Sequence, residues 1–466
     1  MKNILRGLAA LSTLTVLLPV VVGCGGSKLI PDFTMPEGGF DTSKPVVINF
    51  YHTMGQSLIE VLDAYIGEGS EFNQMYPNII VKEKSVGNYD DIRDQLTTEI
   101  SAGANDANIS YCYPDHVARY LKGQSVVTLD NLMYDAEYGY SEAQLNDFVP
   151  AFLKEGQSFG DGKTYCLPFS KSSEVLYYDK TFFAANNLTV PTTWDEMIKV
   201  CRQIKQLDPT SIPLGYDSSS NWFITMCEQL GSEYTTYEEP HYKFNNETMR
   251  GFMKNCVEWY REGLFTTKEL YGGYTSSLFT QIPGEKSARC YMCIGSSAGA
   301  TYQRPEKQGN QYRFDVGITS IPQVNAKETG AVISQGPNVC IFRDEDPQKV
   351  LASWLLVKYL TTNVSFQGQF SAMSGYTPVI KSVNDNEIYK DFLSSADGGD
   401  NIAALSTKVC VEQESMYLTS PAFDGSADAR EEVGQLLDRI LVLPYDSDLD
   451  VAIKSEFDKA IRNLSE

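Results

Sequence analysis

Residues 295–299 of the chain match a motif of serine hydrolases. They read Gly-Ser-Ser-Ala-Gly, the G-x-S-x-G pattern that presents a nucleophilic serine after a strand. In hydrolases of that type the catalytic histidine follows the serine along the chain. The three histidines here, His52, His116 and His241, all precede Ser297. The pattern therefore does not indicate an esterase.

Residues 160–164, with the sequence Gly-Asp-Gly-Lys-Thr, resemble a phosphate-binding loop only in part. Gln157 stands where that motif requires its first glycine, so a hairpin turn is the better interpretation. The histidines are isolated and no H-E-x-x-H pattern is present, which argues against a zinc site, and we expect no cofactor. Carboxylates are abundant, so a glycosidase with a paired acid and nucleophile stays an alternative.

Aromatic side chains could form a wall for a sugar, because an aromatic face packs against the apolar face of a sugar ring. Three of the four tryptophans have structural explanations. Trp194 begins a helix within a capping box, and Trp259 and Trp354 fall on the apolar faces of helices. Trp222 follows the polar residues 217–221, so it is the candidate for a ligand platform.

The amino terminus has the features of an export signal. Lys2 and Arg6 precede an apolar run over residues 8–22. The run is too short for a spanning helix, and the positive charges before it are typical of a secretory signal. The run ends in Val-Val-Gly before Cys24, an arrangement similar to a bacterial lipobox. We expect cleavage before Cys24, acyl chains on that cysteine, and a flexible tether over residues 24–44.

Composition restricts the class of protein. The 466 residues carry a net charge of −22, which disfavours binding to nucleic acid or anionic lipid. A hydrophobic content of 42% excludes a disordered chain, and the length predicts two domains. Apart from Cys24, nine cysteines are scattered, mostly inside apolar runs, and are expected to be buried free thiols.

Strands alternate with helices from residue 45 onward. In the first block we expect strands at 45–51, 78–84 and 108–113 and helices at 58–72, 89–101 and 116–121. The second block has expected strands at 164–168, 175–178, 288–294 and 332–342 and helices at 194–207, 222–230, 247–263 and 347–360, before a helical carboxyl terminus. This alternation predicts parallel sheets with crossover helices, in which ligands bind at the carboxyl ends of the strands.

The order of short patterns along the chain resembles the family 1 extracellular solute-binding proteins, the group of the maltose-binding and glycerol-3-phosphate-binding proteins. The patterns are 48–54 (INFYHTM) with 76–79 (YPNI) and Tyr89, 162–169 (GKTYCLPF), 176–180 (LYYDK), 191–196 (PTTWDE), 294–297 (IGSS) and 374–379 (SGYTPV). They span nearly all of the chain beyond Cys24. Two positions depart from the family pattern: Ser297 replaces an aromatic residue, and residues 110–115 only loosely match an aspartate pattern.

The resemblance implies an α/β fold of two lobes, like that of periplasmic binding proteins. Each lobe would hold a mainly parallel sheet flanked by helices, with the ligand cleft at the hinge. We expect the signal peptide at 1–23, the tether at 24–44, one lobe from 45–157 and 295–365, and the other from 158–294 and 366–466. The chain would bind a solute without turning it over.

Twelve residues are candidates for ligand contact. The first group follows the first and third strands, where such sheets open to ligands: Tyr51, His52, Thr53, Tyr113 and Asp115. The resemblance adds positions near the hinge and in the later patterns: Ser172, Ser173, Ser296, Ser297, Gly375 and Tyr376. Trp222 completes the set.

The implied function is capture of a small polar solute, most of all a carbohydrate, and its delivery to the membrane permease subunits of an ABC importer. A polyol phosphate such as glycerol 3-phosphate is the alternative ligand. A neutral sugar is preferred because Arg430 is surrounded in sequence by Asp428, Glu431 and Glu432. We expect a monomer, lipid-anchored on the outer face of the cytoplasmic membrane, that closes around its ligand.

Overall fold

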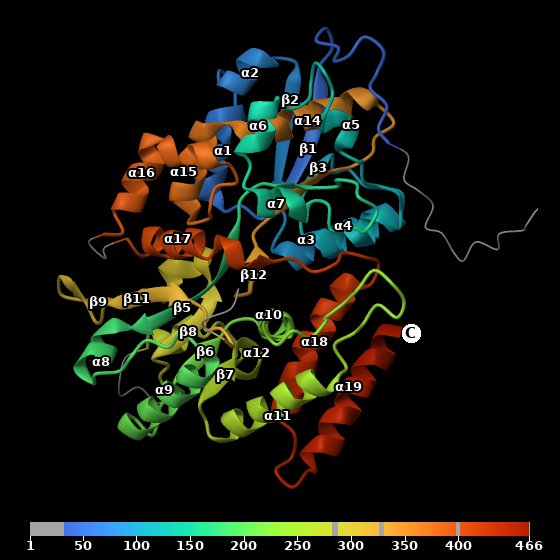
Figure 1. The fold of residues 1–466 in the computed structure, drawn as a ribbon. Helices are drawn as coiled ribbons and strands as arrows, with labels where there is room; N and C mark the ends of the chain where they lie inside the picture. Colours follow the sequence, from blue (N-terminus) through green and yellow to red (C-terminus); the bar gives the residue numbers. More distant parts are fainter. Residues whose placement is uncertain (1–31, 282–287, 326–329, 398–400, 466) are drawn as a thin grey trace, which may run out of the picture.

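The chain forms two lobes, each built on its own β-sheet (Figure 1). The computed structural model describes residues 32–281, 288–325, 330–397 and 401–465. The expected signal peptide, Cys24 and the first part of the tether lie outside these residues. Within the described ranges, no helix combines the length and apolar character needed to cross a bilayer.

The sheet of the first lobe has five strands in the order β2-β1-β3-β13-β4. They are β2 (Ile79–Ser85), β1 (Val46–His52), β3 (Ile109–Cys112), β13 (Asn338–Ile341) and β4 (Leu167–Pro168). β1 is parallel to β2 and β3, as the alternation of strands and helices predicts, whereas β13 is antiparallel to β3 and β4. The last two strands come from distant parts of the chain.

Helices cover this sheet on both faces (Figure 1). The larger ones are α1 (Gln56–Ile66), α3 (Tyr89–Ser101), α4 (Pro114–Leu121), α14 (Pro347–Thr362), α15 (Val364–Ser374) and α16 (Glu387–Ser394). The helix expected over 58–72 is two helices, because α1 ends before Gly67 and α2 (Glu71–Met75) begins after Gly69, which has a positive φ. Shorter helices are α5 (Asp130–Met133), α6 (Glu142–Asp147) and α7 (Pro150–Glu155).

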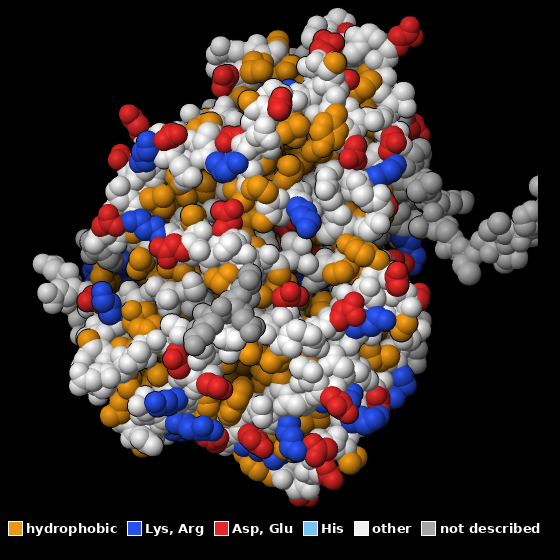
Figure 2. Space-filling view, in the orientation of Figure 1, with side chains coloured by type: hydrophobic (Ala, Val, Ile, Leu, Met, Phe, Trp, Pro, Cys, Tyr) orange, Lys and Arg blue, Asp and Glu red, His pale blue; other side chains and the backbone are white. Residues whose placement is uncertain are grey.

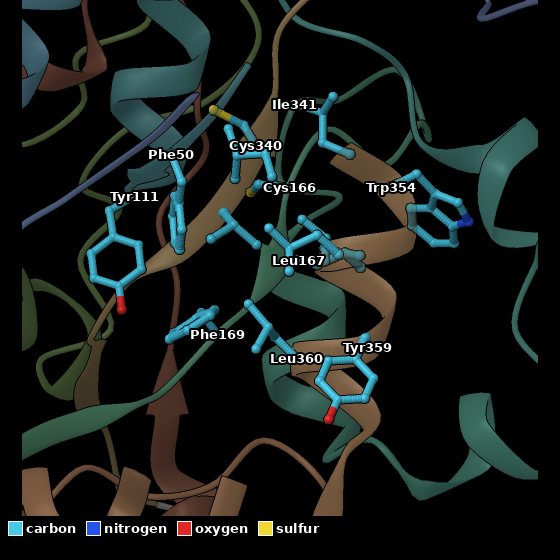
Figure 3. Close-up of a cluster of buried hydrophobic side chains, with 14 of the residues drawn as sticks. Phe50, Tyr111, Cys166, Leu167, Phe169, Cys340, Ile341, Trp354, Tyr359 and Leu360 are labelled. Carbon is cyan, nitrogen blue, oxygen red and sulfur yellow. The ribbon is translucent and has the colours of Figure 1, made fainter. Parts of the chain in front are cut away.

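The core of the first lobe joins segments that are far apart in sequence. Figure 3 shows Phe50, Tyr111 and Phe169 lying together, with Trp354 and Tyr359 of α14 across the same cluster. The ring centroids of Tyr111 and Phe169 are 5.0 Å apart. Since each of these residues has less than a tenth of its surface exposed, the cluster fixes β4 and α14 onto the first sheet.

The sheet of the second lobe has the order β14-β12-β5-β8-β6-β7, and β11 pairs with β5. These strands are β14 (Tyr417–Leu418), β12 (Val332–Gln335), β5 (Ser172–Asp179), β8 (Met292–Ser296), β6 (Leu214–Tyr216), β7 (Phe265–Thr267) and β11 (Val316–Ser320). β6 is parallel to β7 and β8, whereas β5 is antiparallel to its neighbours β8, β11 and β12.

The helices of the second lobe include the long carboxyl-terminal pair α18 and α19, which lie side by side (Figure 1). The described helices of this lobe are α8 (Lys180–Ala185), α9 (Trp194–Leu207), α10 (Ser219–Gln229), α11 (Glu247–Arg261), α12 (Lys268–Tyr271), α13 (Ser276–Phe279), α18 (Ser426–Leu441) and α19 (Leu449–Ser465). α17 (Ile402–Glu412) lies between the lobes, because Ala404 packs in the first core and Val409 against the second sheet. Smaller elements are η1 (Ser297–Gln303), η2 (Lys381–Asp385), η3 (Glu414–Met416), β9 (Lys307–Gln308) and β10 (Gln311–Tyr312).

The boundaries of the lobes differ from those expected. Residues 295–335 were expected in the first lobe, but they supply β11 and β12 to the second sheet. Residues 366–396 were expected in the second lobe, but Phe366, Phe370 and Tyr389 pack in the first core. The chain also returns to the first sheet as β4 before it crosses, so the turn at 160–163 does not mark the boundary.

The nine cysteines in the described part of the chain are free and buried, as expected. Burial raises the pKa of several of these thiols, including Cys201 and Cys256, because a thiolate is poorly solvated in an apolar core. These cysteines therefore act as small apolar core residues.

Candidate functional site

A cleft of about 1080 Å³ lies between the two lobes. On the first lobe its wall is formed by the start of α3, with Asn88, Tyr89 and Arg93, and by Tyr113 and Asp115 after β3. The wall on the second lobe is formed by residues that follow β6, β7 and β8 and by one face of α18. Polar residues thus meet at the carboxyl ends of strands from both sheets, the usual ligand position in such folds.

Three of the twelve candidate residues line this cleft: Tyr113, Asp115 and Ser296. Tyr376 lies directly behind the wall, because its hydroxyl oxygen is 3.4 Å from that of Tyr89. Gly375 ends α15 in the left-handed conformation, which places Tyr376 after the turn. Tyr113, Asp115 and Ser296 therefore lie at the cleft, and their contact with a ligand stays a prediction.

Ser172, Ser173 and Ser297 are buried at the base of the second sheet and do not line the cleft. The backbone N–H of Ser173 donates to Ser297 Oγ at 3.2 Å, and Ser173 Oγ donates to the carbonyl of Ile333 at 2.8 Å. These hydroxyls satisfy groups inside the protein, where an unpaired polar group would be costly. Their place is structural.

Tyr51, His52 and Thr53 are also absent from the cleft wall. His52 is fully buried, and its Nε2 lies 2.8 Å from Glu83 Oε2. Burial lowers the pKa of His52, although the hydrogen bond to Glu83 opposes that effect. Tyr51 is buried under Lys84, whose Nζ is 4.3 Å from the ring centroid. The side chains of Tyr51 and His52 are therefore engaged by Lys84 and Glu83 of β2, and they do not reach the cleft.

The prediction that Trp222 forms a ligand platform is wrong. Its side chain is 1% exposed and stacks on Tyr216, with ring centroids 4.8 Å apart and an interplanar angle of 11°. Trp194 also stacks with Trp222, with ring centroids 5.6 Å apart. The polar residues 217–221 do face the cleft, but α10 begins at Ser219, and the helical turn carries Trp222 to the inner side.

Several polar groups around the start of α10 line the cleft but were not among the twelve candidates. Glu174 is 1% exposed and receives hydrogen bonds from Tyr216 Oη at 2.7 Å and from Asn221 Nδ2 at 3.0 Å. Arg430 of α18 donates to the side-chain oxygen of Asn221. Burial raises the pKa of Glu174 to about 7, against the lowering effect of both hydrogen bonds. The feature of the sequence that could have identified Asn221 and its neighbours is the run Asp-Ser-Ser-Ser-Asn directly after a strand.

Other carboxylates are held beside this group by hydroxyl and amide donors. Asp217 accepts from the backbone N–H and the hydroxyl of Thr275, both at 2.7 Å. Asp438 of α18 accepts from Thr267 Oγ1 at 2.8 Å and from Ser219 Oγ at 2.9 Å. Burial raises the pKa of Asp438 to about 6. Among the described residues, no group of three or more His, Cys, Asp or Glu side chains is arranged to hold a metal ion.

Tyrosines provide the aromatic surface of the cleft. The rings of Tyr89 and Tyr113 are 4.9 Å apart on the first lobe. Tyr274 and Tyr302 line the second lobe, and Tyr302 is 77% exposed. An aromatic ring with one apolar face and a hydroxyl group suits a ligand that is itself part apolar and part polar. Figure 2 shows acidic and basic side chains interspersed on the face it views, without a basic band.

Segments that cross between the lobes meet at a buried ion pair. Lys171 lies between β4 and β5, is fully buried, and pairs with Glu155 at the end of α7. Its Nζ also donates to the carbonyl of Gly336 at 3.2 Å, on the segment between β12 and β13. Gly336 has a φ of +89°, and a Cβ there would stand 2.4 Å from the carbonyl oxygen of Ser170. The two crossing segments are therefore tied closely together.

Two ion pairs span the lobes beside the cleft. Arg119 of α4 pairs with Asp428 of α18, and Lys122 Nζ lies 3.1 Å from Asp424 Oδ2. A smaller cavity of about 60 Å³ shares Tyr113, Asp115 and Arg430 with the cleft and reaches Glu155 at the hinge. The cleft, the crossing segments and the interlobe contacts thus form one continuous region.

Residues 69–393 match the model of a protein family described as bacterial extracellular solute-binding protein. The chain belongs to this family. The resemblance drawn from the sequence is confirmed, and the family is one of binding proteins.

Curated relatives of this solute-binding protein match over parts of their length. They include an uncharacterized ABC transporter extracellular-binding protein of Pyrococcus horikoshii, 25% identical over 34% of this chain and 36% of its own. A multiple sugar-binding protein of Streptococcus mutans is 22% identical over 48% and 53%. The sn-glycerol-3-phosphate-binding periplasmic protein of Brucella abortus is 23% identical over 59% and 61%. The chain thus spans less than two thirds of each relative.

Solved structures share the two-lobed fold over nearly the whole chain. The cyclic alpha-maltosyl-1,6-maltose binding protein from Arthrobacter globiformis has a TM-score of 0.68 at 17% identity, covering 90% of this chain and 99% of its own. UgpB from Mycobacterium tuberculosis, solved in complex with glycerophosphocholine, has a TM-score of 0.70 at 16% identity, covering 91% and 98%. The expected fold class is confirmed.

Proposed function

We propose that this chain captures a small hydroxylated solute, preferably a carbohydrate, in the interlobe cleft and delivers it to the permease subunits of an ABC importer. The observation that carries the proposal is the cleft itself, whose walls come from the strand ends of both lobes. Hydroxyl, amide and carboxylate groups there can bind sugar hydroxyls, and Tyr89, Tyr113 and Tyr302 can pack on the ring. The solute would act by bridging the lobes.

Closure of the cleft is the expected mechanism. A ligand that contacts both walls stabilises the closed arrangement over an open one by its difference in affinity for the two. The crossing segments at Lys171 and Gly336 provide the hinge, and the pair Arg119–Asp428 adds an interlobe contact in the closed state. The importer would then recognise the closed form.

The relatives support two solute classes, since one is a multiple sugar-binding protein and another an sn-glycerol-3-phosphate-binding protein. Of the described cationic side chains that line the cleft, Arg430 is bonded to Asn221, Arg93 pairs with Asp90 and Asp94, and Lys268 lies over the ring of Tyr274. A phosphate group needs cationic or backbone donors free to face it, so the carbohydrate is the preferred class. The alternative of a glycosidase has no support from the family.

Export and anchoring form a second part of the proposal. The amino-terminal sequence supports cleavage before Cys24 and lipid attachment there, which would hold a monomer on the outer face of the cytoplasmic membrane. Detergent partitioning of the expressed protein tests this point. Wild type should enter the detergent phase and Cys24→Ala the aqueous phase, and equal partitioning of the two would refute the anchor.

A thermal-shift screen of residues 32–466 against sugars, glycerol phosphates and amino acids tests the solute class, because a ligand that binds the native state raises Tm. Calorimetry on the best sugar should then show that Tyr302→Ala weakens binding several-fold. Tyr445→Ala is the matched control, since both side chains are nearly four-fifths exposed and only Tyr302 lines the cleft. Equal affinity of the two variants would show that the ligand does not bind against this wall of the cleft. Release of new products from the sugar would indicate an enzyme.

A further inference from the structure

The second-lobe wall of the cleft has more acidic than basic side chains. Five carboxylates line it: Glu174, Asp217, Glu269, Glu431 and Asp438. Among the described residues, the cationic side chains on this wall are Lys268 and Arg430. Because the surface is concave and partly shielded from water, charges there interact more strongly than on an open surface. The wall therefore presents a negative potential to a solute.

Both cationic residues on this wall are already engaged by the protein. Arg430 donates to the side chain of Asn221. Lys268 lies over the ring of Tyr274, with Nζ 4.3 Å from the centroid, and its charge partly offsets the rise that burial causes in the pKa of Asp217. Neither Glu269 nor Asp438 is in an ion pair with a described residue. The two carboxylates face the cleft without a cation in contact.

The hydrogen bonds around these two carboxylates lack a donor. Ser219 Oγ lies 2.9 Å from Asp438 Oδ1 and 3.1 Å from Glu269 Oε2, but a hydroxyl has one hydrogen to donate. Thr267 Oγ1 donates only to Asp438. With both carboxylates ionised, one of the two contacts of Ser219 has no hydrogen. A donor-rich group from the solute would fill this deficit.

The side chain of Gln303 independently presents an acceptor without a donor. Its side chain is 3% exposed and lines the cleft, and its Oε1 has no hydrogen-bond partner. Its Nε2 is occupied by Cys293 Sγ at 3.4 Å, so the amide is held with the oxygen as the unused group. A buried carbonyl oxygen without a donor costs free energy, which a bound N–H or O–H group would recover. Gln335 Oε1, also on the wall, is unpartnered as well.

We propose that the solute is an aminated sugar or amino polyol, whose protonated amine is bound between Asp438 and Glu269 while its hydroxyls reach Gln303 and the tyrosines. This proposal deepens the proposed function and rests on it. An ammonium group has three donors and no acceptor, which matches a wall with unused acceptors. Hydrogen bonds between an ammonium group and carboxylates are about twice as strong as neutral ones. An anionic solute would be repelled by the same groups.

The direction of the pKa shift at Asp438 agrees with this site. Burial raises its pKa to about 6, and neighbouring Glu269 adds to the rise, while Thr267, Ser219 and Arg439 oppose it. A bound ammonium favours the ionised carboxylate, so binding should release a proton near pH 6. Affinity for an amine should therefore rise between about pH 5 and pH 7.

Calorimetry with matched sugars tests the inference. The probes are glucosamine, galactosamine and the β-1,4-linked glucosamine disaccharide, each beside its N-acetylated and its unaminated counterpart. The amine form should bind at least ~10-fold more tightly than either neutral form, because it alone makes charge-assisted contacts. Asp438→Asn and Glu269→Gln should each reduce that preference to less than about threefold. Glu258→Gln, which removes an exposed carboxylate of α11, should retain it.

The outcomes separate this inference from the proposed function. Equal or tighter binding of a neutral counterpart, or failure of every aminated probe to bind, overturns the amine site. If a neutral sugar binds in that case, sugar capture still stands. Circular dichroism would check that the variants are folded. If Asp438→Asn unfolds, Glu269→Gln still tests the amine site, because Glu269 is exposed and its replacement should not disturb the core.

Discussion

Replacement of Trp222 by alanine should destabilise the second lobe without weakening solute binding. The indole is 1% exposed and contacts the rings of Tyr216, Trp194 and Phe265, so alanine leaves a large cavity in the core. Truncation of a buried tryptophan costs about 3–5 kcal/mol. For a lobe of about 200 residues, this corresponds to a fall in Tm of roughly 6–20 °C.

A second substitution at the same position sharpens the test. Trp222 Nε1 has no hydrogen-bond partner, so Trp222→Phe loses volume but no hydrogen bond, and it should cost less than half as much as alanine. Differential scanning calorimetry gives Tm, and isothermal titration gives the affinity for the best sugar. If Trp222→Ala binds several-fold more weakly with an unchanged Tm, the side chain belongs to the cleft and the packing argument fails.

Three further predictions concern the hinge, the cleft floor and the interlobe contact. Lys171→Met should lower the free energy of unfolding by about 3–5 kcal/mol in urea titrations, because it leaves Glu155 buried and unpaired; a loss below about 1 kcal/mol would contradict this. The pKa of Glu174 is raised in the folded state, so the stability that its protonated form contributes is complete below about pH 4.5 and is lost towards pH 7. Glu174→Gln should therefore flatten the decline of Tm with pH over that range. An unchanged pH profile of Tm would contradict this prediction. Arg119→Ala should increase the radius of gyration of the ligand-free protein, measured by X-ray scattering, and change the free energy of unfolding by less than about 1 kcal/mol. Asp428→Ala should give the same increase. If neither variant alters the scattering, this ion pair does not favour closure.

Local patterns predicted the elements of the fold better than their assembly. The capping box from Thr193 to Glu196 is present as expected, because its two hydrogen bonds depend on neighbours in sequence. The lobe boundaries were misplaced because β11 and β12 join the second sheet, and β4 joins the first, through long-range pairing, which no local pattern records. The function class followed from the order of short patterns along the whole chain.

The candidate site was predicted only where a strand end and the cleft coincide. Tyr113 and Asp115 follow β3 and line the cleft, as their position at the end of a strand predicted, and their contact with a ligand stays a prediction. Asp438 lies more than 200 residues beyond Ser219, and only the packing of α18 on α10 brings the two together. Trp222 shows the opposite error, since its polar neighbours in sequence do not share its side of the helix.

The place of β13 in the first sheet also constrains the order in which the chain can fold. This strand lies between β3 and β4, so the first lobe lacks an interior strand until residue 341 is available. A chain that ends before that point would leave β3 and β4 with unpaired edges, which are sites of aggregation. Completion of the first lobe must therefore wait until most of the second-lobe sheet has been synthesised, and truncation from the carboxyl end should disable both lobes together.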